Sequence, residues 1–303
     1  MAQKKKYLIN IIGPTAVGKT KLSILLAKEF EAEIFSSDSR QIFMEMNIGT
    51  AKPTQEELSQ VVHHFIHEKS IQEKYSAGKY EDEIILALGK YFESHDIAIL
   101  SGGTGLYIDA VLFGLDSFPE IPQSIDEKVD KMEEEKGLDF LIKELEKLDP
   151  EYFEKVDLQN SRRISRALKV IYGSGKKYSS FLNQEKETRK FTTINILLER
   201  DRAELYDRIN HRVDQMMKDG QMEEAKALFQ FKELRSLQTV GYKEIFDHLD
   251  GNYGLNFCIE EIKKNSRRYA KRQITWFKKY DAKSFHPSQQ KEIVEHIKQH
   301  ILL

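Results

Sequence analysis

The residues with the clearest chemistry form an unbroken G-x-x-x-x-G-K-T motif near the start of the chain. It reads Gly13-Pro14-Thr15-Ala16-Val17-Gly18-Lys19-Thr20. An apolar run, residues 7–12, precedes it, and a helix-like run, residues 21–28, follows it. In that context the glycines let backbone N–H groups turn inward, the start of the helix adds partial positive charge, and Lys19 supplies a cation. The motif therefore predicts a polyphosphate cradle; the alternative is a chance glycine-rich turn between a strand and a helix.

A second candidate site follows the next apolar run and reads Ser36-Ser37-Asp38-Ser39-Arg40-Gln41. Residues just beyond the carboxyl ends of strands in an open parallel sheet face the ligand crevice, so we expect Asp38 near the phosphate cradle. A carboxylate there can act as a general base or hold magnesium. Gln41 can read the edge of a nucleobase. The alternatives are purely structural: a helix cap or turn for Ser-Asp-Ser, and a surface position for Gln41.

A third candidate, Ser101-Gly102-Gly103-Thr104-Gly105-Leu106-Tyr107, follows another strand-like run. Close approach of the backbone to a ligand explains its glycines, and Thr104 can donate to a phosphate or a base. A tight strand-to-helix turn explains the glycines equally well. Phosphate-hydrolysing proteins with such a cradle commonly end this strand in an aspartate for magnesium. Here the strand ends in Leu100-Ser101-Gly102, which argues against an ATPase.

Arg208 and Arg212 lie one helical turn apart, so both can point to the same side of a helix. An arginine directed into the crevice could clamp a diphosphate with two parallel hydrogen bonds. The alternative is a solvated helix on which Asp207 and Asp214 are the charge partners.

Residues 267–279 interleave cations with aromatic rings. Phosphate contacts from the cations and stacking by Tyr269 or Trp276 would suit structured RNA. The alternative places Trp276 and Phe277 in the core with the lysines in water, and for these aromatics the pattern favours the core.

The bulk composition indicates one or two domains and a charged partner. The chain has 303 residues, of which 40% are hydrophobic, enough for a core and one further module. The net charge of −2 conceals separated patches, because carboxylates predominate over residues 126–157 while 162–177 and 263–279 are basic. Such asymmetry suggests an anionic macromolecule as partner.

The single cysteine, Cys258, excludes an internal disulfide and favours a reducing compartment. His63, His64 and His67 could place two imidazoles on one helical face, but without a paired cysteine or carboxylate they are more typical of solvated or core-edge positions. We see no apolar stretch of signal or membrane-spanning length. A soluble, cytoplasmic protein is expected, with a monomer as the default.

The order of the elements predicts an α/β fold. Strands are expected at 7–12, 33–36, 97–101 and 192–198, and helical patterns at 81–92, 202–229 and 269–279. Gly220 and Gly251 are expected to end helices, because glycine tolerates the left-handed geometry there. Residues 124–182 read as wholly helical. We therefore expect a P-loop NTPase-like parallel sheet with helices on both faces, formed by residues 1–114 and 189–303, and an inserted all-helical domain at 115–188.

Together these segments make the chain resemble the tRNA dimethylallyltransferase (tRNA isopentenyltransferase) family, bacterial type. The resemblance is carried by the 13–20 motif, Ser37-Asp38-Ser39-Arg40-Gln41, Asn47-Ile48-Gly49-Thr50-Ala51-Lys52-Pro53, Gly102-Gly103-Thr104-Gly105-Leu106-Tyr107, Arg163-Ile164-Ser165-Arg166-Ala167-Leu168, Gly241-Tyr242-Lys243-Glu244 and Ala270-Lys271-Arg272-Gln273-Ile274-Thr275-Trp276. They stand in family order over nearly the whole chain. The 48–53 and 270–276 runs are the most specific.

The resemblance implies transfer of a dimethylallyl group from dimethylallyl diphosphate to N6 of the adenosine 3′ of the anticodon, in tRNAs reading codons that begin with U. It implies Asp38 as the base, Thr15 and Arg212 as further catalytic residues, and the 13–20 loop around diphosphate with Mg²⁺ at Thr20. It also implies an insertion that grips the anticodon stem. The residues implied at the tRNA are Asp38, Ser39, Arg40, Gln41, Thr104, Arg163, Arg166, Lys271 and Arg272.

The chain departs from the family pattern at a few positions on the prenyl-side and RNA-side walls. They are Phe43, Val62, His67 and the segment around Asp157. Three other functions share parts of the pattern. A small-molecule or nucleotide kinase would share the cradle and sheet, an adenylate prenyltransferase would share Asp38 but need no RNA grip, and an RNA-binding protein could have kept the cradle without catalysis.

Overall fold

The computed structural model describes residues 4–301. The chain forms two compact units. The core unit consists of Met1–Phe113 and Arg189–Leu303, and the inserted unit consists of Gly114–Thr188. No helix within residues 4–301 has the length and apolar character needed to cross a membrane.

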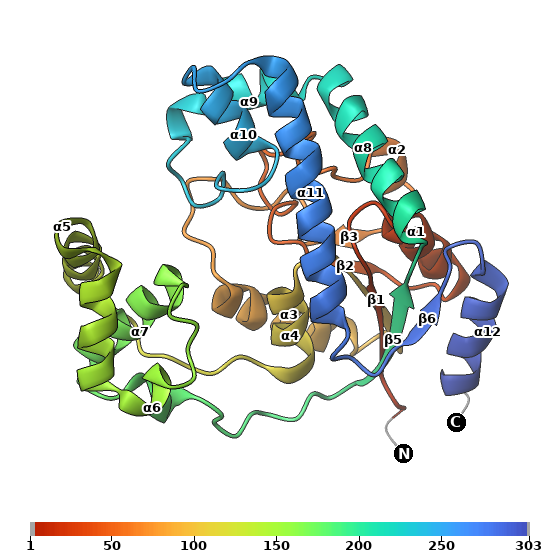
Figure 1. The fold of residues 1–303 in the computed structure, drawn as a ribbon. Helices are drawn as coiled ribbons and strands as arrows, with labels where there is room; N and C mark the ends of the chain where they lie inside the picture. The colour runs from red at the N-terminus through yellow and green to blue at the C-terminus, as the bar shows by residue number, and fades with distance from the viewer. Residues whose placement is uncertain (1–3, 302–303) are drawn as a thin grey trace. The chain divides into compact units, whose positions relative to one another are not determined.

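The core unit is built on a six-stranded sheet with the order β3-β2-β4-β1-β5-β6 (Figure 1). Its strands are β1 (Tyr7–Ile12), β2 (Ile34–Ser36), β3 (His63–His64), β4 (Ile97–Ser101), β5 (Thr192–Leu198) and β6 (Lys283–Phe285). Every neighbouring pair is parallel, so all carboxyl ends lie at one edge of the sheet. All six residues of β1 are buried, as expected for the centre of a parallel sheet.

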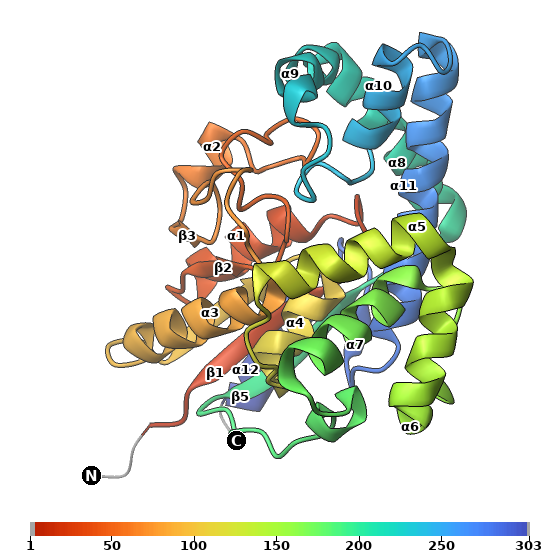
Figure 2. The same ribbon diagram turned by 90° about the vertical axis from the view of Figure 1, so that its left-hand side faces the viewer.

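Helices cover both faces of this sheet, which confirms the predicted fold class (Figures 1 and 2). The helices of the core unit are α1 (Lys19–Glu29), α2 (Gln55–Leu58), α3 (Ala77–Tyr91), α4 (Gly105–Phe113), α8 (Arg202–Lys218), α9 (Gln221–Leu228), α10 (Tyr242–Leu249), α11 (Leu255–Phe277) and α12 (Gln290–Ile301). On one face α1 and α12 pack against Ile9 and Ile11. On the other face Ile108 of α4 and Phe277 of α11 pack against Ile12.

The inserted unit is built from helices, but residues 124–182 are not helical throughout as the sequence predicted, because turns separate the helices. It contains α5 (Gln123–Leu148), α6 (Pro150–Phe153), α7 (Ser161–Ser174) and a 3₁₀ turn at Tyr178–Phe181. Gly137 has a φ of 75° and interrupts α5, while Pro150 stands at the first turn of α6 because it cannot continue the preceding helix. The side chain of Asn160 caps α7, and Gly175 ends it with a φ of 70°.

This unit has a hydrophobic core of its own. Leu141 and Leu145 of α5 pack there with Ile164 and Leu168 of α7. Asp149 is fully buried and accepts hydrogen bonds from the backbone N–H and the hydroxyl of Ser179. The inserted unit thus folds around apolar side chains that α5 and α7 turn toward each other.

Two further details of the core unit bear on the sequence predictions. The helical pattern expected over 202–229 forms two helices, and Gly220, the predicted helix end, separates α8 from α9 with a φ of 104°. The histidine pair does not lie on a helix: His63 and His64 form β3, where the ring of His64 stacks on Phe35 and its Nε2 pairs with Glu33.

Candidate active site

The phosphate loop connects β1 to α1 through backbone angles that ordinary residues rarely adopt. Gly13 and Gly18 have φ values of 149° and 117°, and Ala16 adopts a left-handed φ of 63° that is rare outside glycine. A Cβ on Gly13 would stand 2.7 Å from the carbonyl oxygen of Leu198. The close packing of β1 against β5 therefore requires glycine at this position.

Two arginines that follow β5 hold the outer carbonyls of this loop. The Nε of Arg200 donates to Val17 O at 2.9 Å, and the Nε of Arg208 donates to Ala16 O at 2.9 Å. Arg208 thus binds the loop, whereas Asp207 pairs with His211. The N–H groups of Thr15 and Val17 are already bonded within the protein, to Gln273 Oε1 and Pro14 O, so the N–H groups at the start of α1 are the ones available to an anion. The role of Arg200 was not predicted, and no motif in the sequence signals it.

Lys19 is folded back on the loop. Its Nζ donates to Gly13 O at 2.8 Å and Pro14 O at 3.0 Å. Burial, together with the nearby charge of Arg212, lowers the pKa of Lys19 to about 7, against the opposing charge of Asp38. The positive charges around the loop are therefore not balanced by negative ones. A bound anion would raise the pKa of Lys19 and favour its protonated form.

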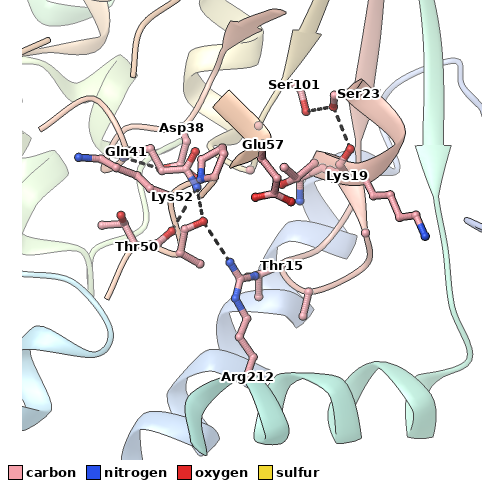
Figure 3. A pocket seen from close by; sticks show the side chains of 18 of the residues that line it. Thr15, Lys19, Ser23, Asp38, Gln41, Thr50, Lys52, Glu57, Ser101 and Arg212 are labelled. Carbon is pink, nitrogen blue, oxygen red and sulfur yellow. Dashed lines mark hydrogen bonds between the residues drawn. The ribbon is translucent and has the colours of Figure 1, made fainter. Parts of the chain in front are cut away.

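Arg212 projects from α8 toward the phosphate loop (Figure 3). Its Nη1 donates to the Thr15 hydroxyl at 3.2 Å and its Nη2 reaches Ala51 O at 3.5 Å. Burial lowers the pKa of Arg212, while the charge of Asp38 raises it. The guanidinium stays charged because its reference pKa is so high. It therefore brings a fixed cation to the mouth of the loop.

These groups line a cavity of about 950 Å³ at the carboxyl edge of the sheet. The predicted residues that face it are Thr15, Ala16, Gly18, Lys19, Thr20, Asp38, Gln41 and Arg212. The Thr20 hydroxyl has no hydrogen-bond partner among the described residues. Gly13, Pro14 and Val17 complete the loop behind this wall and are buried.

Asp38 closes a turn and also lines the cavity. Its Oδ1 accepts from the backbone N–H groups of Arg40 at 2.9 Å and Gln41 at 3.2 Å, which closes a turn. Its Oδ2 has no hydrogen-bond partner among residues 4–301, and the residue lines the cavity (Figure 3). One oxygen thus fixes the side chain while the other can accept a proton.

Thr104 and Ser39 join the two loops beyond β2 and β4. The Thr104 hydroxyl accepts from Ser39 N at 3.0 Å and donates to Ser39 Oγ at 3.1 Å. A Cβ on Gly102 would stand 2.3 Å from Ser37 Oγ, so this glycine permits close approach of another part of the protein. The hydroxyl of Ser101, at the end of β4, accepts from Ser23 of α1 at 2.7 Å.

The amide of Gln41 supports the 47–53 segment. Its Nε2 donates to Thr50 O at 3.2 Å and Ala51 O at 3.1 Å, so only its oxygen remains for a ligand. On the far side of the segment, the carboxylate of Glu224 accepts from three consecutive backbone N–H groups. They belong to Asn47, Ile48 and Gly49. Glu224 also accepts from the Tyr242 hydroxyl at 2.5 Å.

Lys52 lies at the centre of the same segment. Its Nζ donates to Phe43 O, to Asn47 Oδ1 and, at 3.0 Å, contacts Nδ1 of His67. Burial lowers the pKa of Lys52 to about 8, against the opposing charges of Glu224 and Glu45. His67 therefore contacts the ammonium group of Lys52 here. Phe43 is buried and its ring needs no hydroxyl partner.

Gln273 of α11 connects the phosphate loop to the glycine segment after β4. Its Oε1 accepts from Thr15 N at 2.8 Å, and its Nε2 donates to Gly103 O at 2.8 Å. The side chain is 5% exposed. The Tyr269 hydroxyl, one turn earlier, donates to the same carbonyl at 3.2 Å. Gln273 was not singled out from the sequence alone. The available signal was its place within the 270–276 run, four residues and so one helical turn after Tyr269.

The remaining residues predicted at RNA are exposed. Arg163 and Arg166 project from α7 of the inserted unit, where Arg166 lies over the Phe118 ring at 5.5 Å. Lys271 and Arg272 project from α11 of the core unit. Neither pair takes part in an ion pair among the described residues.

Comparison with known proteins decides the family. The IPP transferase family model matches residues 41–280. The tRNA dimethylallyltransferase of Flavobacterium psychrophilum is 54% identical, over 90% of this chain and 91% of its own length. The tRNA dimethylallyltransferase 1 of Bacteroides fragilis is 48% identical, over 96% of this chain and 97% of its own. This chain belongs to the tRNA dimethylallyltransferase family.

Solved structures agree with this assignment. The tRNA isopentenylpyrophosphate transferase of Bacillus halodurans is 36% identical, with a TM-score of 0.73 over 98% of this chain and 97% of that one. A eukaryotic dimethylallyltransferase, solved acting on tRNA, is 31% identical, with a TM-score of 0.74 over 90% of this chain and 70% of that one. The family predicted from the sequence is confirmed.

Proposed function

We propose that this protein transfers the dimethylallyl group of dimethylallyl diphosphate to N6 of the adenosine 3′ of the anticodon, in tRNAs reading codons that begin with U. A bond forms between C1 of the dimethylallyl group and N6, and the bond between C1 and the diphosphate oxygen breaks. N6 loses one proton, and diphosphate leaves with the bonding electrons.

One observation carries this proposal: a carboxylate and a cationic anion cradle face the same cavity. Asp38 lines one side, and Lys19, Arg212 and the phosphate loop line the other. A nucleophile beside Asp38 and a diphosphate in the loop would therefore meet between them. Both charge changes of the transfer have a fixed group to receive them.

The loop and its cations stabilise the leaving group. Negative charge grows on the diphosphate as the C1–O bond breaks, and the N–H groups at the start of α1, Lys19 and Arg212 offset it. Arg212 holds the Thr15 hydroxyl at 3.2 Å, so the two act as one unit at the loop's mouth. Oδ2 of Asp38 takes the N6 proton, since Oδ1 is occupied by Arg40 and Gln41.

The residues fit a magnesium ion, which we propose as the cofactor. Mg²⁺ prefers one or two protein oxygens together with water and phosphate oxygens. The Thr20 hydroxyl is such an oxygen, and no cluster of three or more His, Cys, Asp or Glu within residues 4–301 offers a competing site. A bound Mg²⁺ would partly neutralise the diphosphate charge.

The proposed partners are the tRNA anticodon stem-loop and dimethylallyl diphosphate, which the protein binds as a monomer in the cytoplasm. Exposed cations on both units, Arg163 and Arg166 on one and Lys271 and Arg272 on the other, support an RNA partner over a free nucleotide.

A kinase function is less well supported. Kinases and ATPases of this fold use a carboxylate at the end of this strand. Here β4 ends in Ser101, whose hydroxyl accepts a hydrogen bond from Ser23 of α1.

The test is a single-turnover assay with dimethylallyl diphosphate, Mg²⁺ and unmodified tRNA, followed by mass analysis of the nucleosides. We expect N6-isopentenyladenosine from the wild type. The variant Asp38→Asn keeps an acceptor oxygen for the turn but cannot take a proton, so its rate should fall by about 10²–10⁴-fold with unchanged folding. ATP turnover without a modified nucleoside would favour the kinase, and prenylation of free adenylate over tRNA would favour the adenylate prenyltransferase.

A further inference from the structure

Trp276, the single tryptophan of the chain, lies at the surface. It is 38% exposed, whereas the adjacent Phe277 is 1% exposed. The sequence pattern favoured the core for both rings, and this is correct for Phe277 and wrong for Trp276. An exposed indole beside the cavity of an enzyme has no role in the chemistry proposed above.

The exposed indole is part of a larger apolar surface made by α4 and α11, which pack together (Figure 1). Leu106 and Phe113 are 46% and 52% exposed and lie seven residues apart, on the same face of α4. Asp109, on that face between them, accepts from the Tyr280 hydroxyl at 2.5 Å, and Phe113 stacks on the Tyr280 ring. We call Leu106, Phe113 and Trp276 the indole surface.

The indole is held in a fixed position by the glycine segment. A Cβ on Gly105 would stand 2.4 Å from two atoms of the Trp276 ring, so the ring lies directly on the backbone there. A ring that is already fixed loses little conformational entropy when another ring stacks on it. The surface is therefore pre-organised for a flat ligand.

Two cations flank the indole on its own side of α11. Lys279, one turn after Trp276, places its Nζ 4.4 Å from the indole centroid and also pairs with Asp109. Arg272, one turn before Trp276, has no ion pair among the described residues. Cations beside an exposed aromatic ring are complementary to the phosphates and bases of single-stranded RNA.

The surface borders the cavity. Gln273 and Tyr269 line the cavity and both donate to Gly103 O, while Trp276 lies one helical turn beyond Gln273, or about 5 Å along the axis. Gly105, under the indole, is two residues past Gly103. A strand that delivers one base to Asp38 would thus pass its neighbouring nucleotide over the indole.

We propose that Trp276 is a stacking platform for the base next to the adenosine that is modified, with the phosphate between them held by Arg272 and Lys279. The inference rests on the proposed function, whose tRNA substrate it takes. The ammonium group of Lys279 lies over the indole ring. Because this side chain is long and exposed, it can move from the ring to the phosphate when a base stacks on the ring.

Because the chain has no other tryptophan, its fluorescence reports this contact directly. We expect an anticodon stem-loop RNA to quench the emission of the full-length protein in a saturable manner, and diphosphate alone to leave it unchanged. Two further RNAs carry an abasic site, one on the 5′ side of the target adenosine and the other on the 3′ side. Both should bind, and one of them should no longer quench the tryptophan emission.

Kinetics separate stacking from folding. Trp276→Ala should raise the KM for the stem-loop about ten-fold and leave the KM for dimethylallyl diphosphate unchanged, whereas Trp276→Phe should retain most of the affinity. Ile274→Ala is the matched control, because Ile274 is 40% exposed on the opposite side of the same helix. Thermal unfolding of each variant checks its stability.

Unchanged emission at saturating RNA, or a wild-type KM for Trp276→Ala, would overturn the stacking role even if tRNA is modified normally. Quenching by RNA in a protein that makes no isopentenyladenosine would support the platform while contradicting the proposed reaction. A Trp276 variant that alters self-association in sedimentation, with RNA affinity intact, would assign the surface to a second copy of the chain and overturn the proposal.

Discussion

The side chains around the cavity divide into those whose hydrogen bonds are complete and those with an open group. Glu224 uses its carboxylate on three backbone N–H groups and the Tyr242 hydroxyl, so it shapes a loop. Asp38 uses only one oxygen in its turn, and the Thr20 hydroxyl has no partner among the described residues. Groups that still lack a hydrogen-bond partner are the ones that can bind substrate. Residue type alone did not distinguish Asp38 from Glu224 in this respect.

Lys19 gives a prediction at this scale that depends on pH. With the pKa of Lys19 near 7 in the free protein, most molecules carry a neutral Lys19 at pH 8. A bound diphosphate raises that pKa, so binding at pH 8 should take up close to one proton and diphosphate affinity should fall as pH rises above 7. Calorimetry in buffers of different ionisation enthalpy measures the uptake.

The control is Lys19→Arg, whose side chain stays charged throughout this range. It should bind diphosphate with less proton uptake than the wild type, the remainder coming from the ligand's own ionisation. Equal uptake by the two proteins would show that Lys19 is already protonated in the free protein.

At the scale of elements, α11 links the parts of the site that the sheet alone does not join. The strands bring the phosphate loop and the glycine segment to one edge, and Gln273 then holds the two together through Thr15 N and Gly103 O. Arg212 from α8 reaches the same Thr15 through its hydroxyl. Thr15 is therefore positioned from two helices.

We predict that Gln273→Ala lowers kcat by about ten-fold and stability by about 1–3 kcal/mol, since it leaves the Thr15 N–H without its partner and removes one of the two donors to Gly103 O. Gln273→Glu should cost more activity, because a carboxylate oxygen would face Gly103 O. Thr275→Ala changes an exposed side chain on the same helix and should behave as wild type. Steady-state kinetics and urea unfolding provide the measurements; normal kcat in Gln273→Glu would contradict the positioning role.

The elements also show what the sequence could predict. The central strands and the phosphate loop were predictable because apolar runs and the G-K-T spacing are local signals, and β1, β4 and β5 lie where expected. The two-residue β3 and three-residue β6 were missed, since each is too short to show a period and exists only by pairing with β2 and β5. Gln273 and Glu224 were missed for a related reason: their partners are backbone atoms far away in sequence.

At the scale of the molecule, the inserted unit leaves and re-enters the core unit at neighbouring points. It begins after Phe113, the last residue of α4, and ends before Arg189. The side chain of Arg189 donates to Ala110 O and Val111 O of α4 and pairs with Glu81. Both ends of the insertion are thus fixed to one helix of the core unit.

This arrangement predicts that the two units can be separated. Replacing residues 115–188 with a short Gly-Ser linker should leave the core unit folded, because its sheet and hydrophobic core contain no residue of the insertion. The shortened protein should bind diphosphate as the full chain does. It should lose most of its tRNA affinity, since Arg163 and Arg166 are removed.

Calorimetry with diphosphate and filter binding with tRNA test the two halves of this prediction on one protein. The full chain with Arg163→Ala and Arg166→Ala provides the milder comparison. A plot of its log tRNA affinity against log salt concentration should have a shallower slope than that of the wild type. The slope should change by about one unit or slightly less for each RNA phosphate that the variant no longer neutralises. Replacing Lys147 and Lys155, which are exposed but paired with Glu144 and Glu151, should change the salt slope much less. If the shortened protein bound tRNA as tightly as the full chain, RNA recognition would belong to the core unit and its α11 surface alone.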